Sequence, residues 1–343
     1  MLEIFSKIFA SLHQHEIIYC HWKSTNHIEA TFNGNTDVDI LVSRQSRIKF
    51  EEILSDFGFI SLKTSNFRSY PSIYDFVLYD GNSSKWIHFH VHYELILGDR
   101  WSKSYYLPYS HLILSNRIFD QNYNTYTINP GHEYILFIIR MSCKYYFPFL
   151  KKNIKSELSC IKSLISNEDI YLGNIFYKNL LNLESRPIYY KYFFAIFNRI
   201  KLRSFRYKSY FYFRVSIILR FAFRYFIEFR RRILKNYNMG RRSIGSGGIV
   251  VAFVGTDGSG KTTIVRNATS VFSKQLNVFN TFLGNGSSGC SWYRSIIFFI
   301  LGKKPFLKSH KELRLKNGNK SNVSLLYCIW ILICTFDKYS CLK

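Results

Sequence analysis

The sequence has few acidic residues for its length. Asp and Glu number 22 against 47 Lys and Arg in 343 residues, which gives a formal net charge of +25 at pH 7. A chain this basic is suited to anionic partners such as phosphates, nucleic acids or anionic membrane surfaces. The hydrophobic fraction of 47% excludes a disordered chain and leaves enough apolar residues for two folded domains.

Several common patterns are also lacking. The seven Cys form no C-x-x-C pair and no metal-finger spacing, so we expect free thiols in a reducing cytoplasm. No run reaches about 18 apolar residues, and the amphipathic segment 1–15 contains no apolar signal core, so we expect no membrane span and no secretory signal. These absences favour a cytoplasmic protein.

One motif that is present is a phosphate-binding loop. Residues 255–263, Gly-Thr-Asp-Gly-Ser-Gly-Lys-Thr-Thr, fit the pattern G-x-x-x-x-G-K-[ST]. A Gly-rich turn lets backbone N–H groups surround phosphate oxygens, a Lys neutralises the outer oxygens, and a hydroxyl ligates Mg²⁺. The sequence therefore predicts binding of ATP and Mg²⁺, with Thr262 as the Mg²⁺ ligand. The expected ATP-binding residues are Gly255, Gly258, Ser259, Gly260, Lys261, Thr262 and Thr263.

The residues around the loop favour a strand, a loop and a helix. Residues 249–254 form a continuous apolar run typical of a buried parallel strand, and residues 263–276 have helical periodicity. We also expect a strand over residues 278–283 and a helix over residues 324–336. A doubly wound sheet usually needs about 150 residues, more than follow position 249, so we expect an incomplete parallel sheet.

The run Phe253-x-Gly255-x-Asp257-Gly258-x-Gly260-Lys261-Thr262-Thr263 resembles the loop of thymidylate kinases and of the thymidylate kinase-like proteins of bacterial surface-polysaccharide loci. The resemblance implies an ATP-dependent kinase in which Lys261 is the phosphate lysine and Asp257 the loop acid, both catalytic. The family's later Asp-Arg pair and Arg-bearing lid have no counterpart here. We expect a truncated kinase region, and the sequence leaves open whether it catalyses transfer.

A Mg²⁺-binding carboxylate on a later strand is also missing. A phosphate-binding loop needs such a carboxylate. The only acids after Asp257 are Glu312 and Asp337, and neither ends an apolar strand.

A second motif lies near the N-terminus. Asp37 and Asp39 stand at positions i and i+2 of an apolar strand in residues 34–42, so both carboxylates point to the same side. Two divalent ions held by paired carboxylates are what a two-metal phosphoryl-transfer site requires. We therefore expect Asp37 and Asp39 to be metal ligands.

The order of the elements around this motif supports a fold assignment. It comprises a helix over 1–15, a strand over 17–20, the Asp-x-Asp strand, a helix over 44–57, and a hairpin of residues 73–80 and 85–95. This order resembles the nucleotidyltransferase fold. Residues from about 15 to 145 are also similar to the nucleotidyltransferase-like region that precedes the kinase-like region in the same polysaccharide-locus proteins.

A nucleotidyltransferase usually has a third carboxylate on a neighbouring strand, where this sequence has His90 or His92. His88, His90 and His92 alternate with apolar residues and share one strand face. Imidazole suits transition metals better than Mg²⁺. Three interpretations stay open: a degenerate substrate-recognising domain, a transferase with altered metal use, or structural histidines on a solvent face. Asp75 and Asp80 are alternative acids on the partner strand.

A basic segment follows the first domain. Residues 191–242 carry a single acid, Glu228, among many Lys and Arg interleaved with aromatic residues. This connector either also contacts an anionic membrane surface or is a plain structural link. We do not expect a nucleic-acid partner, because no recognised nucleic-acid motif accompanies it. Before it, a helix begins at Pro130, and after it the Gly- and Ser-rich residues 241–248 predict a flexible boundary.

These observations predict three regions: an α+β nucleotidyltransferase-like domain over 1–148, a helical basic connector over 149–242, and an incomplete α/β P-loop kinase-like domain with a parallel sheet over 243–343. The expected function is phosphoryl transfer from ATP to an unidentified nucleotide or sugar acceptor, linked to surface-polysaccharide (lipopolysaccharide) biosynthesis. One alternative is a non-catalytic, nucleotide-binding assembly factor peripheral to the inner membrane. Another is a nucleotidyltransferase that acts through Asp37 and Asp39.

Overall fold

The computed structural model describes residues 1–63, 69–98, 103–144, 152–169, 242–245, 247–256 and 258–276, together with residues 171, 215, 218–223, 225–227, 229, 278 and 280. The chain divides into two compact units. The first comprises Met1–Ala252 and Phe272–Asn277, and the second comprises Phe253–Val271 and Val278–Lys343.

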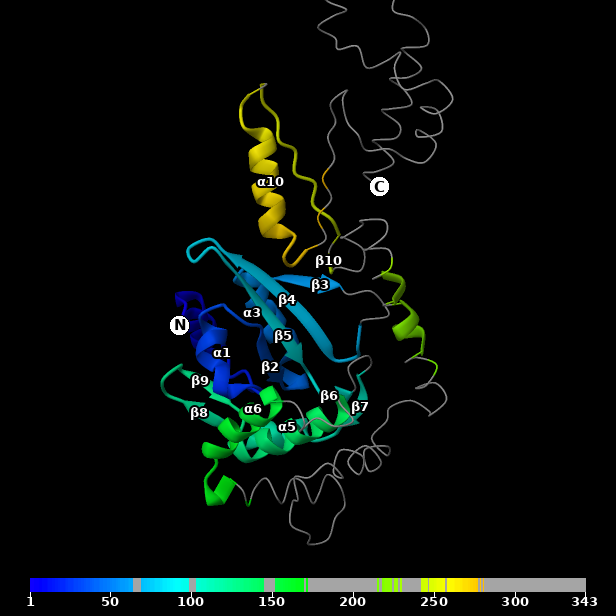
Figure 1. The fold of residues 1–343 in the computed structure, drawn as a ribbon. Helices are drawn as coiled ribbons and strands as arrows, with labels where there is room; N and C mark the ends of the chain where they lie inside the picture. The colour runs from blue at the N-terminus through cyan, green and yellow to red at the C-terminus, as the bar shows by residue number, and fades with distance from the viewer. Residues whose placement is uncertain are drawn as a thin grey trace, which may run out of the picture. The chain divides into compact units, whose positions relative to one another are not determined.

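A mixed eight-stranded sheet forms the centre of the first unit (Figure 1). Its strand order is β10-β3-β4-β5-β2-β1-β9-β8. β2 is parallel to β5 and β1 is parallel to β9, whereas the other neighbours are antiparallel. The strands are β1 Tyr19–His21, β2 Val38–Val42, β3 Ile60–Lys63, β4 Ile73–Asp80, β5 Lys85–His92, β8 Ile118–Asp120, β9 Thr125–Thr127 and β10 Ser243–Ile244. The sequence predicted helices and strands together in the first domain. The mixed sheet and its helices confirm this part of the fold class.

Three helices cover one face of this sheet: α1 Glu3–Gln14, α2 Ile28–Phe32 and α3 Arg47–Asp56. α1 forms because its apolar residues recur at helical spacing, and Phe5, Ile8, Phe9 and Leu12 are all buried. They pack against the alternate residues of the sheet that point the same way, such as Phe89 of β5. The predicted helices over 1–15 and 44–57 are therefore confirmed, although the second begins with a short 3-10 turn, Arg44–Ser46.

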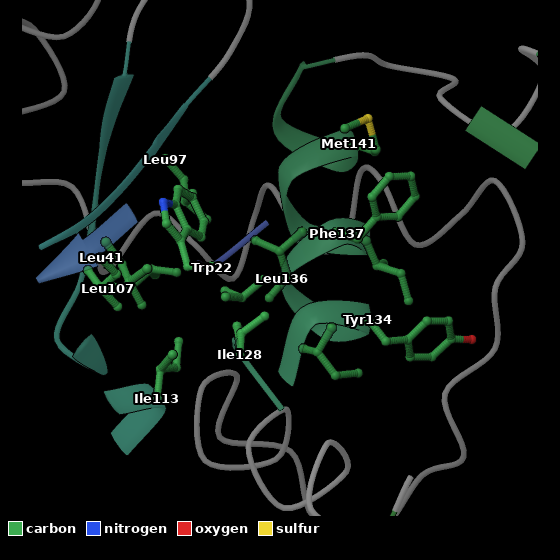
Figure 2. Close-up of a cluster of buried hydrophobic side chains, with 14 of the residues drawn as sticks. Trp22, Leu41, Leu97, Leu107, Ile113, Ile128, Tyr134, Leu136, Phe137 and Met141 are labelled. Atoms are coloured by element: carbon green, nitrogen blue, oxygen red, sulfur yellow. The ribbon is translucent and has the colours of Figure 1, made fainter. Parts of the chain in front are cut away.

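A second core contains α4 Ser110–Ser115, α5 Pro130–Lys144, α6 Lys152–Ser163 and the hairpin of β6 Leu95–Gly98 and β7 Lys103–Leu107. Figure 2 shows Trp22 and Leu41 of the sheet region beside Leu136 of α5. α5 begins at Pro130 as predicted, and the side-chain oxygen of Asn129 accepts a hydrogen bond from the backbone N–H of Gly131. This core lies at the sheet face that carries Leu41.

The sheet gains its last strand from a distant segment. Ser243 and Ile244 form β10, antiparallel to β3. The prediction of a flexible boundary over 241–248 is wrong for these two residues. The physical reason is that β3 without β10 would be an edge strand with unpaired backbone N–H and C=O groups, which β10 satisfies.

The predicted strand before the phosphate-binding loop does not form. Residues 249–254 have no strand structure, and the exposed fractions of Ile249, Val251 and Val254 are 71%, 67% and 93%. A parallel strand is stabilised by neighbours that cover it. Among the described residues after Gly245 there is no strand to pair with it. The predicted helix is confirmed as α10, which runs from Lys261 to Phe272 rather than from 263 to 276.

The other predictions for the C-terminal half fall mainly outside the described residues. They are most of the strand over 278–283, the helix over 324–336, and most of the basic connector. In the part of the chain that the structure describes, no helix is both long and apolar enough to cross a membrane.

Candidate functional site

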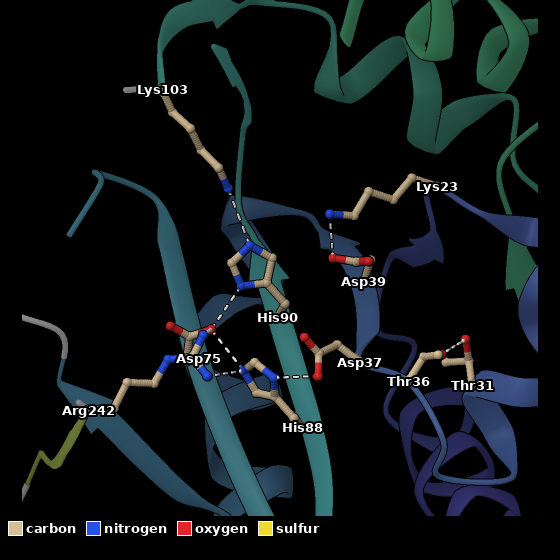
Figure 3. A network of polar contacts seen from close by, with 10 residues as sticks. All are labelled: Lys23, Thr31, Thr36, Asp37, Asp39, Asp75, His88, His90, Lys103 and Arg242. Carbon is tan, nitrogen blue, oxygen red and sulfur yellow. Dashed lines mark hydrogen bonds and ion pairs between the residues drawn. The ribbon is translucent and has the colours of Figure 1, made fainter. Parts of the chain in front are cut away.

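Three adjacent strands bring the conspicuous acids and histidines of the first unit together. The parallel pairing of β2 and β5 places Asp39 beside His90 and Leu41 beside His92. The antiparallel pairing of β5 and β4 places His90 opposite Asp75. Because side chains alternate between the faces of a strand, these residues lie on the face opposite α1 and α3. Figure 3 shows the resulting polar network.

Hydrogen bonds link Asp37, His88, Asp75 and His90 in series. His88 donates from Nδ1 to Asp37 Oδ1 over 2.8 Å and from Nε2 to Asp75 Oδ1 over 2.9 Å. His90 Nδ1 donates to the same Asp75 oxygen over 2.8 Å. Asp75 and His88 are buried, whereas the Asp37 side chain is half exposed. The network thus runs from solvent into the sheet.

The protonation of this network follows from its contacts. Burial disfavours the charged form of Asp75, but the hydrogen bonds from His88 and His90 outweigh it and hold the pKa of Asp75 well below its usual range. Burial likewise opposes protonation of His88, but its two carboxylate partners raise the pKa of His88. Burial lowers the pKa of His90 despite its bond to Asp75. The pKa values of the two neighbouring imidazoles are therefore shifted in opposite directions.

Three cationic side chains surround the acids. Lys23 Nζ lies 2.6 Å from Asp39 Oδ1, and Lys103 Nζ lies 3.3 Å from His90 Nε2. Arg242 Nη2 lies 3.3 Å from Asp75 Oδ1, and Arg242 Nη1 lies 3.3 Å from His88 Nε2. Burial and the nearby charge of Lys23 lower the pKa of Lys103 to about 7. Burial also lowers the pKa of Lys23, although Asp39 opposes this shift.

A tight turn positions Lys23 after β1. Ser24 has a left-handed φ of 59°, which turns the chain sharply. The buried carboxylate of Glu133 in α5 accepts hydrogen bonds from the backbone N–H of Thr25, over 3.0 Å, and from its hydroxyl. α5 therefore anchors the turn that delivers Lys23 to Asp39.

The structure decides between several of the sequence-based alternatives. The solvent-face interpretation of the three histidines is wrong, because His88 and His92 are only 3% and 1% exposed. Asp75 joins the site as its third acid, whereas Asp80 accepts hydrogen bonds from Asn82 and Ser83 in its own turn. The hairpin is confirmed, but β5 ends at His92.

The donor atoms fit a nitrogen-binding metal better than Mg²⁺. Mg²⁺ demands octahedral oxygen ligation. Asp39 offers oxygen, but the residue beside it in the sheet is His90, and Asp75 is already bound to two imidazoles. Two overlapping groups have ligand atoms within 4.8 Å of one another: Asp39, His90 and His92, and Asp75, His88 and His90. Mixed imidazole and carboxylate sets favour transition metals, so Mg²⁺ fits these surroundings less well than a transition metal does.

The predicted phosphate-binding loop lies in the second unit. Gly258 and Gly260 have left-handed φ angles of 83° and 80°, and α10 begins directly afterwards at Lys261. Lys261 Nζ donates to the carbonyl oxygens of Gly255, over 2.7 Å, and Thr256, and lies 3.4 Å from Ser259 Oγ. Thr262 and Thr263 are exposed in the first turn of α10. Asp257 lies outside the described residues.

Sequence reasoning missed the three cations of the first site. Lys103 and Arg242 belong to no recognisable motif, because their positions depend on long-range packing. Lys23 carried a weak signal, since it directly follows the strand that neighbours the Asp-x-Asp strand.

No family model matches the chain, and no curated protein matches it. A weak structural similarity is to the antibiotic-resistance factor ANT(2'')-Ia, known from a solution structure. It covers 51% of this chain and 90% of that chain, with 9% sequence identity and a TM-score of 0.30. A similarity this low carries no argument about fold or function.

Proposed function

We propose that the first unit binds a nucleoside triphosphate on the face of β2, β4 and β5 that carries Asp39 and His90 and transfers its nucleotidyl group to an acceptor. The observation that carries this proposal is the convergence of Asp37, Asp39 and Asp75 with Lys23, Lys103 and Arg242 on one sheet face. Acids together with cations are what a site needs to bind metal-associated phosphates.

The cations have a clear role in this reaction. Lys23, Lys103 and Arg242 bind the phosphate oxygens and neutralise the charge that develops on the leaving group. An acceptor hydroxyl loses its proton to water as its oxygen forms a bond to the α-phosphorus. The bond between that phosphorus and the α–β bridging oxygen breaks, and pyrophosphate leaves. A divalent cation, when bound, supplies further neutralisation of the phosphates. Lys23 Nζ lies 2.6 Å from Asp39 Oδ1, so the cation and the acid occupy the same part of the site.

The first test is nucleotide binding by calorimetry with ATP, GTP, CTP and UTP in the presence of Mn²⁺. Lys23→Met should weaken binding about tenfold or more, because it removes a partly buried cation that binds phosphate. Lys49→Met, which removes an exposed lysine of α3 on the opposite sheet face, is the matched control and should leave this binding unchanged. Pyrophosphate release with a panel of sugar and nucleotide acceptors then measures transfer. If Lys23→Met and Asp39→Asn bind and release as the wild type does, the proposal is wrong.

A second candidate function is ATP binding by the loop of residues 255–263. It is supported by the left-handed glycines and by Lys261, whose ammonium group already lies against loop oxygens. This function would be phosphoryl transfer to a nucleotide or sugar in surface-polysaccharide biosynthesis, or nucleotide binding without turnover in an assembly factor at an anionic membrane surface.

ATP hydrolysis and binding in wild type and Lys261→Ala separate these outcomes. Binding and turnover that are both lost in the variant support a kinase. Binding without turnover supports the assembly factor, for which salt-sensitive binding to anionic vesicles is the further expectation. Equal ATP binding by the two proteins would contradict any role for the loop.

A further inference from the structure

One group of side chains in the site has the composition of a transition-metal centre. The ligand atoms of Asp39, His90 and His92 lie within 4.8 Å of one another. Asp39 and His90 are register partners on the parallel strands β2 and β5, and His92 follows two residues later on the same strand face. The pairing of β2 with β5 therefore fixes the backbone positions of all three residues.

His92 is the member of this group that most needs a ligand. It is only 1% exposed, and neither ring nitrogen forms a hydrogen bond among the described residues. Burying polar atoms without partners costs free energy. A buried neutral imidazole with an available nitrogen is the form of His that binds metals.

His90 has the second partner that metal-binding histidines usually have. Its Nδ1 donates to Asp75 Oδ1 over 2.8 Å, which leaves Nε2 to accept a bond. Carboxylates that hold the other ring nitrogen fix the orientation and tautomer of a metal-binding imidazole. In the structure, Lys103 Nζ lies 3.3 Å from this Nε2.

Ammonium groups lie where a metal ion would be held. Lys23 Nζ contacts Asp39, and Lys103 Nζ contacts His90. A divalent ion bound here would replace both contacts with a stronger charge. The other group, Asp75, His88 and His90, is less suited because its atoms already bind one another and Arg242 lies against them.

We propose that Asp39, His90 and His92 bind one transition-metal ion of the zinc class, with Asp75 as the positioning residue for His90. One carboxylate and two imidazoles favour Zn²⁺ or Co²⁺ over Mg²⁺. The inference rests on the proposed function for its connection to nucleotides, since it names the metal of that same site. Metal binding itself can be measured without any nucleotide.

The test is titration of the metal-free full chain with Zn²⁺ against a chromophoric chelator, and with Co²⁺ while its visible absorption is recorded. One ion should bind per chain. His92→Gln and Asp39→Asn should each weaken binding about tenfold or more. His21→Gln is the matched control. His21 is also buried with two unpartnered nitrogens, but it pairs with Ile40 and therefore points to the opposite sheet face. It should bind as the wild type does.

Two outcomes would overturn the inference: no binding by the wild type, or equal binding by wild type, His92→Gln and Asp39→Asn. Circular dichroism of each variant shows whether it folds, and Asp39→Asn serves as the test if His92→Gln does not. Zn²⁺ binding without nucleotidyl transfer under any metal would leave the metal site standing and contradict the proposed function. Nucleotidyl transfer with Mg²⁺ but without Zn²⁺ binding would support the proposed function and overturn the metal site.

Discussion

Arg242 Nη2 lies 3.3 Å from Asp75 Oδ1. The two residues are far apart in the chain, and their contact depends on the pairing of β10 with β3, which is itself the neighbour of β4. The end of the basic connector, directly before β10, therefore supplies a charge to the acidic site of the first unit. This contact couples the position of that segment to the electrostatics of the site.

Replacing Arg242 tests this coupling. Arg242→Ala should lower the free energy of unfolding by about 1 kcal/mol, because it removes a charge-assisted contact of a partly exposed side chain. Urea unfolding measures the change. Arg220→Ala, which alters an Arg that lies over the Tyr70 ring and 3.5 Å from the carbonyl oxygen of Ser69, is the control for loss of positive charge. An unchanged urea midpoint for Arg242→Ala would show that the contact does not contribute to stability.

Asp75 should make the first unit sensitive to acid. Its pKa is held well below the unfolded value near 3.8, so the ionised form stabilises the fold above that pH. This contribution is lost as the pH falls below about 4 towards the pKa of the folded state. Asp75→Asn should be less stable at pH 7 by about 1–3 kcal/mol and should lose less stability between pH 5 and pH 3. Urea midpoints across this range check both effects, and parallel curves for the two proteins would contradict them.

His21 should make the stability of the first unit depend on pH over a higher range than Asp75 does. Burial lowers its pKa from 6.5 to about 4, so between these values the unfolded chain binds a proton that the folded chain does not. Stability must therefore fall as the pH drops from 6.5 to 4. At about 1.4 kcal/mol per pKa unit, the loss due to His21 approaches about 3 kcal/mol. Urea unfolding of His21→Leu should therefore show a smaller loss of stability between pH 6.5 and 4 than the wild type, by about 3 kcal/mol. Identical pH profiles for the two proteins would show that His21 does not cause the loss.

Glu133 should control the turn that carries Lys23. Glu133→Ala removes the acceptor of two hydrogen bonds from Thr25 and should cost about 1–3 kcal/mol. Glu133→Gln keeps an acceptor oxygen and removes a buried ionisable group. Burial raises the pKa of the Glu133 carboxyl, which means that burial disfavours its charged form. It should therefore be the milder change. The two urea midpoints, compared with the wild type, test this order, and equal losses would mean that the hydrogen bonds are not the cause.

The sequence predicted the elements that have local causes. The apolar spacing of 1–15 produced α1, and Pro130 marked the start of α5. The alternation of His88, His90 and His92 placed them on one face, as did the spacing of Asp37 and Asp39. These predictions succeeded because helix and strand periodicities are written in neighbouring residues.

The apolar run 249–254 shows where the same reasoning failed. Its composition predicts a buried strand, but a strand needs partners, and composition does not state whether they are present. The identity of the third acid also depended on pairing: Asp75 and Asp80 share one strand, and only the register with β5 placed Asp75 opposite His90.

By itself, then, the sequence determined which residues could carry chemistry: the Asp-x-Asp pair, the alternating histidines and the loop of residues 255–263. The tertiary structure alone decided that Lys23, Lys103 and Arg242 lie against the first two groups and that His92 is buried without a hydrogen-bond partner among the described residues. The reason is that strand register, turn geometry and the addition of β10 are set by contacts between distant segments, which no local pattern encodes.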